Sequence, residues 1–171
     1  MRIILVYLSI GILIVIAGAA ALLFTPLGER PLTALFSVGA VEKIDFAKLR
    51  LTDKPNQFLM CPPDLCSIKP HADSPVFNIP ADRLLLRWRD VLAAQPRIEI
   101  LAEDLEARQF DYVQRTERFR FPDLITVRFI VVSPSRSTLA IYSRSVYGKS
   151  DFGVNRDRID AWLKSLQNRL E

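Results

Sequence analysis

The sequence contains little cysteine, histidine or glycine. Among its 171 residues there are 2 Cys, 1 His and 6 Gly. Two cysteines exclude a disulfide-dense mini-protein, and a single histidine excludes a metal site built from several histidines. The glycines complete neither of the phosphate-binding motifs GxxxxGK[ST] and GxGxxG, so we expect no nucleotide and no other cofactor.

The excess of positive charge is small as well. Lys and Arg number 23 against 19 Asp and Glu, which leaves a net charge of +4. That excess is too weak to hold a nucleic acid, and no aromatic residues accompany a basic tract, so no nucleic-acid partner is expected. Apolar residues make up 50% of the chain and charged residues 25%, which excludes a disordered protein.

Charge is absent altogether from Ile3 to Phe24. At about 1.5 Å per residue, a helix over this run is long enough to cross a hydrocarbon core of about 30 Å. A cleaved secretory signal is the alternative, because Ala17-Gly18-Ala19 resembles a cleavage site. The apolar turn after that site and the length of the run favour a retained anchor. We therefore predict that residues 1–25 are a single-pass transmembrane anchor.

Few basic residues flank the predicted anchor. Arg2 precedes it, and Arg30 and Lys43 follow it, so the positive-inside rule is nearly balanced. A very short N-terminal tail is easily left in the cytoplasm. This arrangement predicts that the body of the protein lies outside the cytoplasm, with the membrane as its first partner.

Residues 26–57 connect the anchor to the rest of the chain. Apolar residues from Pro31 to Val41 lie on one side of a short helix: Leu32, Leu35, Phe36 and Val38. This pattern predicts either a segment in the membrane interface or a simple packing segment, since it is too short to span. Asp53-Lys54-Pro55-Asn56 is a turn signal. We interpret residues 26–57 as an interfacial segment followed by a tether.

Residues 58–80 hold many of the prolines: Pro62, Pro63, Pro70, Pro75 and Pro80. Proline lacks an N–H and forces its predecessor into extended geometry, so this stretch is predicted to be loop, not helix or sheet interior.

Cys61 and Cys66 lie within this loop. They flank a Pro-Pro-Asp turn and can approach disulfide distance in an oxidising compartment. The alternative is a zinc site that adds His71 and either Asp64 or Asp73. The cysteine spacing and the lack of an evident fourth ligand favour the structural disulfide, with no metal.

Hydrophobic periodicity predicts an α+β domain over residues 81–171. Helical spacing of apolar residues marks helices over 81–95 and 158–170. Alternation predicts strands over 97–101, 124–132 and 138–146, with a turn at Pro122-Asp123. Residues 110–116 and 116–121 are predicted to form either one long strand or a bent pair. Short turns make neighbouring strands antiparallel, which predicts a sheet of three to four strands with flanking helices on one face. Arg118 and Arg120 would lie together on one side of the sheet, with Thr126 and Arg128 together on the next strand. A solvated face is favoured for these residues, and a ligand-binding surface is the alternative.

Residues 144–156 form a polar loop that links the last strand to the last helix. Asn155 suits an N-cap position. Glycine, lysine and the free amides of a helix start are the general form of an anion site. Our candidate ligand-binding residues are Arg144, Tyr147, Lys149, Ser150, Asp151, Asn155 and Arg156. The alternative is architectural: the glycines turn the chain, Asp151 caps the helix or pairs with an arginine, and the aromatic residues pack the helix onto the sheet.

Two runs carry a family resemblance. RSVYGKSDFGVNRDR (residues 144–158) resembles the R-S-x-x-G-x-S-D-x-G-x-N-x-x-R signature of the family named domain of unknown function 1499. TERFRFPD (residues 116–123) is similar to its second hallmark, a strand that ends in aromatic-Pro/Val-Asp. The resemblance extends from Asn56 to Leu170. It implies a small protein, often exported or membrane-anchored in bacteria and also present in plastids, with no established activity and no catalytic residues to carry over.

These observations predict a protein of the bacterial inner membrane with its C-terminal domain in the periplasm. We expect a binding or assembly module that recognises an anionic ligand, an anionic lipid headgroup or an envelope protein. The alternative is an envelope hydrolase or lipid-modifying enzyme that uses Asp151 with Ser150 or His71. A binding module is favoured, because the sequence offers no evident nucleophile–base pair.

Overall fold

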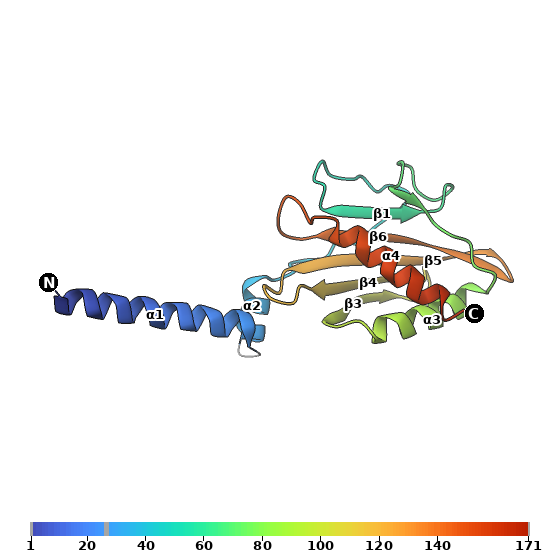
Figure 1. Cartoon of the computed structure of the whole chain (residues 1–171). Coiled ribbons are helices and arrows are strands. Elements are labelled where there is room, and N and C mark those ends of the chain that lie inside the picture. The colour runs from blue at the N-terminus through green and yellow to red at the C-terminus, as the bar shows by residue number, and fades with distance from the viewer. Residues whose placement is uncertain (1, 26–27, 171) are drawn as a thin grey trace.

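The computed structural model describes residues 2–25 and 28–170. A long N-terminal helix extends away from a domain of sheet and helices (Figure 1). From Ile3 to Phe24 this helix is long and apolar enough to cross a membrane. In chain order the elements are α1 (Arg2–Phe24), α2 (Glu29–Leu35), β1 (Gln57–Cys61), β2 (Ala72–Asp73), α3 (Ala81–Ala93), β3 (Ile98–Asp104), β4 (Gln109–Arg115), β5 (Pro122–Ser133), β6 (Arg136–Ser145) and α4 (Val154–Gln167).

The strands form one sheet in the order β2-β1-β6-β5-β4-β3. Every neighbouring pair is antiparallel except β1 and β2, which run parallel. The predicted α+β class is confirmed. The described residues form six strands instead of the predicted three to four, and the sheet is mixed. Both additional strands, β1 and β2, come from the chain before residue 81.

The prediction that residues 58–80 take no part in a sheet interior is wrong at their start. β1 lies between β2 and β6 and is buried along its whole length. It ends before Pro62, so all of its residues keep an N–H that can donate to a neighbouring strand. Phe58 and Met60 face one side of the sheet and Leu59 and Cys61 face the other. Because both faces are covered, the strand shows no polar alternation that would reveal it in the sequence.

The predicted strand over residues 116–121 is also absent, since the chain turns there. Arg120 has a φ of 58°, a left-handed conformation that no strand residue adopts. Thr116 closes the turn, because its N–H donates to the Phe121 carbonyl at 3.0 Å and its hydroxyl accepts from the Phe121 N–H at 3.0 Å. β5 begins at Pro122, where a turn was predicted, and Pro is tolerated at the first position of a strand. Arg118 and Arg120 are therefore not on a sheet face.

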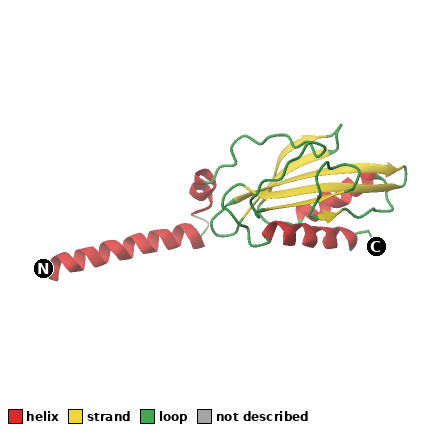
Figure 2. Ribbon diagram, turned by 90° about the horizontal axis from the view of Figure 1, so that it is seen from above, coloured by secondary structure: helices red, strands yellow, loops and turns green. Residues whose placement is uncertain are grey.

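Both flanking helices cover the same face of the sheet, as predicted (Figure 2). The apolar side of α3 and that of α4 meet over β4, β5 and β6. Trp88 of α3 contacts Trp162 of α4 with 5.6 Å between ring centroids. Phe110 and Phe129 lie beneath them in the same core. This face therefore carries the main hydrophobic core.

The opposite face is not simply solvated. Residues 36–51, which we call the strap, run from α2 back along this face. Phe46 and Leu49 of the strap are buried against Leu59 of β1 and Tyr142 of β6. The strap is also held by Gln109, whose side-chain amide donates to the Ile44 carbonyl at 2.8 Å. The segment predicted to be a tether is thus packed onto the sheet, because its apolar residues cover the apolar residues of that face.

Candidate functional site

The candidate residues of the signature segment (residues 144–158) lie on both faces of the sheet. Side chains alternate along β6, so Ser143 and Ser145 face the helices, whereas Tyr142 and Arg144 face the strap side. The Arg144 guanidinium lies 4.8 Å from the centroid of the Tyr142 ring and donates to the Thr126 hydroxyl at 3.4 Å. Burial lowers the pKa of Arg144 from its ordinary value.

Asn155 lies at the centre of a buried network on the helix face. Its side-chain oxygen accepts from the Ser143 hydroxyl at 2.5 Å and from Arg158 Nη1 at 2.7 Å. Its side-chain amide donates to the Asn56 carbonyl and to the Ser145 hydroxyl, each at 3.1 Å. Asn155 has no exposed surface. A single amide thus ties α4 to β6 and to the chain that enters β1, so its role is architectural.

Arg158 extends this network to the middle of the sheet. Its guanidinium pairs with the Asp123 carboxylate of β5 and donates through Nε to Gln114 of β4 at 2.7 Å. Both partners of the pair are buried. Neither Arg158 nor Asp123 is among the candidate residues predicted from the sequence. The available signal was that Arg158 ends one hallmark run and Asp123 ends the other.

Asp151, not Asn155, caps α4. Its carboxylate accepts from the Gly153 N–H at 3.1 Å and from the Asn155 N–H at 2.9 Å. Burial raises the pKa of Asp151, but these hydrogen bonds outweigh it and hold the pKa below its ordinary value. Gly153 has a φ of 88°, which is why glycine occupies the position before Val154. The prediction that Asn155 is the N-cap is therefore wrong. The architectural alternative, in which Asp151 caps the helix, named the correct residue.

The remaining candidates lie at the surface. Lys149 is exposed, and the Ser150 hydroxyl accepts from the Phe152 N–H at 3.3 Å. Arg156 lies 5.0 Å from the centroid of the Phe58 ring, on the face opposite to Arg144. The structure thus does not bring the predicted basic residues together around one anion site.

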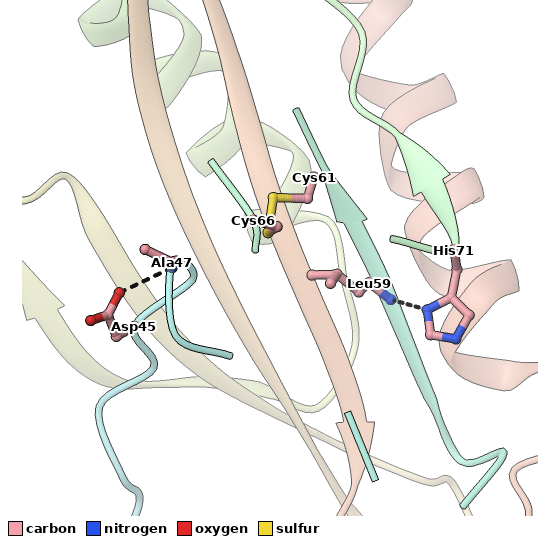
Figure 3. Close-up of a disulfide and its surroundings, with 6 residues drawn as sticks. All are labelled: Asp45, Ala47, Leu59, Cys61, Cys66 and His71. Carbon is pink, nitrogen blue, oxygen red and sulfur yellow. Dashed lines mark hydrogen bonds between the residues drawn. A yellow bond between two sulfur atoms is a disulfide. The ribbon is translucent and has the colours of Figure 1, made fainter. Parts of the chain in front are cut away.

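Cys61 and Cys66 form the predicted disulfide (Figure 3). They are joined to each other and so are not free to bind a metal. His71 follows in the same loop, and its Nδ1 accepts from the Leu59 N–H at 3.0 Å. Burial, assisted by the charge of Arg156, lowers the pKa of His71. Among the described residues no hydrogen bond joins His71 to Asp151 or Ser150.

The end of the domain nearest the apolar helix α1, which we call the anchor end after the predicted anchor, is bonded to the segment that follows α1. Phe36 packs against Phe121 with 4.5 Å between ring centroids, and the Tyr147 hydroxyl donates to the Ser37 carbonyl at 2.9 Å. Arg120 pairs with Glu29 of α2 at 2.6 Å. Of the candidate residues, Tyr147 is the one that reaches this contact.

Fold and site together define an α+β domain that follows an N-terminal apolar helix. A buried polar network joins the last helix of this domain to the sheet. The family model described as "Protein of unknown function (DUF1499)" matches residues 50–166. The chain therefore belongs to this family, as the two hallmark runs predicted.

No curated protein matches the sequence significantly. Two solved structures are distantly similar. The di-domain ARO/CYC BexL from the BE-7585A biosynthetic pathway shares 14% identity over 56% of this chain and 44% of its own, with a TM-score of 0.42. The chain thus spans less than half of that protein. The Zhui aromatase/cyclase from Streptomyces sp. R1128 shares 17% identity over 57% of this chain and 82% of its own, with a TM-score of 0.34. At these scores the likenesses carry no argument about this chain.

Proposed function

We propose that this protein is a membrane-tethered binding module, held in the periplasm with the anchor end of its domain against the anionic surface of the inner membrane. The observation that carries the proposal is the bonded junction between anchor and domain. α2 and the start of the strap are attached to the domain by an ion pair, a hydrogen bond and ring packing, which supports an orientation with this end of the domain toward the bilayer.

Two contacts at the C-terminal end of α1 support a defined orientation. A side chain on Gly28 would overlap the Leu22 carbonyl group of α1, so only glycine allows the chain to pass this close to the anchor helix. Farther on, the Arg118 guanidinium lies 5.4 Å from the centroid of the Phe24 ring at the end of α1. Gly28 and Arg118 therefore both lie close to the C-terminal end of α1.

The loops at the anchor end suit a bilayer surface. The turn over residues 116–121 and the loop over residues 146–153 lie at the same end of the sheet as α1 (Figure 1). Phe152 is 95% exposed and Phe119 is 47% exposed, and basic side chains accompany them at Arg118 and Lys149. Exposed aromatic and basic residues are typical of the membrane interface, where rings enter the headgroup region and cations meet anionic lipids.

Fluorescence quenching tests the orientation on the full chain in lipid nanodiscs. The two native tryptophans are buried, so Phe152→Trp adds a probe at the anchor end and Leu105→Trp adds a matched probe at the opposite end of β4. We expect brominated lipids to quench the first variant strongly and the second one little. Equal quenching of the two probes would contradict the proposal. Reporter fusions at the C-terminus test the periplasmic placement separately.

Charge dependence tests the recognition of anionic lipid. In nanodiscs that contain phosphatidylglycerol, Phe152→Trp should be quenched more than in nanodiscs of phosphatidylcholine alone. Adding Lys149→Glu should remove that difference, because the loop then loses its cation and gains a repelling charge. If lipid charge has no effect on quenching, the anchor end does not recognise anionic lipid.

A further inference from the structure

A cavity of about 510 Å³ lies between α2 and the edge of the sheet at the anchor end. Glu29, Arg30 and Thr33 of α2 form one wall, and Arg97, Arg115 and Arg120 form the other. Sites for small ligands commonly have volumes of about 300–1,000 Å³, so the cavity can hold a headgroup or a small anion. None of the ligand candidates from the sequence lines it.

The charges in this cavity are unbalanced. It is lined by four arginines and by two glutamates, Glu29 and Glu99. Glu29 is engaged by Arg120 at 2.6 Å. Within the described part of the chain, no carboxylate lies at ion-pair distance from the other three arginines. The walls therefore offer guanidinium groups whose charge the fold does not neutralise.

The charge of Arg115 is the most unfavourable of these, because its side chain is buried. The residue is 9% exposed. Its Nη1 donates to the Phe36 carbonyl at 2.9 Å and to the Arg120 carbonyl at 3.1 Å, and in the described structure its Nε has no hydrogen-bond partner. A buried cation without a carboxylate is unfavourable, and an anion in the cavity would supply the missing charge.

The backbone places two further arginines around Arg115. Arg97 and Arg120 have φ values of 55° and 58°, which are uncommon for residues other than glycine. Arg97 also donates through Nε to the Arg115 carbonyl at 3.1 Å. The turns that precede β3 and follow β4 thus direct arginines to one cavity from two separate segments.

We propose that this cavity binds the phosphoryl group of a membrane lipid headgroup. Guanidinium groups present forked donors that match the oxygens of a phosphate, and several of them can share one such group. One wall is α2, which begins directly after the apolar helix ends, so the cavity would lie at headgroup depth. A free phosphate ion has the same binding chemistry. The choice of a lipid headgroup over free phosphate rests on the membrane placement proposed above. The binding of a phosphoryl group does not.

Calorimetric titration of the purified full chain in neutral detergent tests the site at constant ionic strength. The two titrants are inorganic phosphate and short-chain phosphatidylglycerol. We expect phosphatidylglycerol to bind and Arg115→Met to weaken its binding at least about tenfold. Arg128→Met is the matched control, because Arg128 lies on the same face outside the cavity, and it should bind like the wild type.

A second variant covers the case in which Arg115→Met does not fold. Arg30→Gln removes an exposed cation from the α2 wall and should weaken binding without loss of structure. Equal affinity for inorganic phosphate would overturn the lipid as source and leave a free-phosphate site. Wild-type affinity in Arg30→Gln and in a folded Arg115→Met, or no binding of either titrant, would overturn the site altogether. The titration does not depend on which end of the domain faces the bilayer, so its failure is distinct from failure of the quenching experiment.

Discussion

Two arginines of this protein are buried to a similar degree but have opposite surroundings. The Arg158 side chain is 7% exposed and pairs with the Asp123 carboxylate, and its other donors reach three side-chain oxygens. Arg115 as a whole residue is 9% exposed, and among the described residues it donates only to the carbonyls of Phe36 and Arg120. The fold neutralises the first charge and leaves the second without a counter-charge.

This difference separates architecture from candidate function. Arg158 and Asp123 end the two hallmark runs, and their side chains pair within the fold. The unbalanced charge lies in the cavity beside Arg115, which directly precedes the second hallmark run, and Arg120 of that run also lines the cavity. The Arg158 network therefore holds α4 to the sheet, and the arginine cavity is where a ligand has a reason to bind.

The largest expected effect comes from breaking the neutralised region. Arg158→Met leaves the Asp123 carboxylate buried without its partner, which should lower the free energy of unfolding by about 3–5 kcal/mol. Urea denaturation of the full chain in detergent, followed by circular dichroism, measures the loss. A loss below about 1 kcal/mol would show that this pair does not stabilise the sheet–helix contact.

A smaller loss is expected at the cap of the same region. Asp151→Asn removes a charged acceptor from the first turn of α4 and should cost about 1 kcal/mol at neutral pH. Because the folded-state pKa of Asp151 is lowered, the unfolded chain binds more protons as pH falls below about 4. The contribution of Asp151 is thus complete above that pH and is lost below it. Urea midpoints of wild type and variant should converge in acid; a constant difference would refute this account.

Arg115→Met, the same substitution at the second arginine, tests most directly whether the two arginines differ. Arg115→Met removes a buried charge that lacks a carboxylate and also removes a donor from two carbonyls, so the two effects oppose each other. We expect the free energy of unfolding to change by no more than about 1 kcal/mol in phosphate-free buffer. A loss as large as that of Arg158→Met would make Arg115 a structural tie and erase the contrast.

The smallest effect is expected at Tyr147, which links the signature segment to the start of the strap. Tyr147 belongs to the signature segment, and its exposed hydroxyl donates to the Ser37 carbonyl just after α2. Tyr147→Phe should lower global stability by only about 0.5 kcal/mol. Hydrogen exchange should nevertheless become faster in the amides at the start of the strap. Unchanged exchange there would mean that the other contacts of the junction hold it without the Tyr147 hydroxyl.

Much of the fold followed from local patterns. The length of the uncharged apolar run predicted α1. The periodicity of apolar residues predicted α3 and α4, because each helix buries one stripe, and alternation with β-branched residues predicted the long strands β5 and β6. β1 has only five residues, none of them β-branched, and is covered on both faces, so neither pattern marked it. The turn at Thr116 to Phe121 could not be predicted either, because its alternating arginines and phenylalanines imitate a strand.

The candidate site was predicted less well. The segment that contains Asp151 and Asn155 was recognised from its residues, but which of its groups are buried depends on contacts with Asn56 and Ser143, far away in the chain. The arginine cavity was missed entirely. Its walls come from α2 and from the ends of β3 and β4, and no short motif joins them.

The sequence by itself determined the apolar N-terminal helix, the α+β class, the family and the disulfide, because each depends on residues close together in the chain. Only the tertiary structure decided which charges are neutralised. Burial and pairing depend on what lies across the sheet: Asp123 reaches Arg158 from another strand, whereas Arg115 has no carboxylate beside it in the described structure. An arginine side chain therefore ties α4 to the sheet at Arg158 and, as we propose, binds a ligand at Arg115.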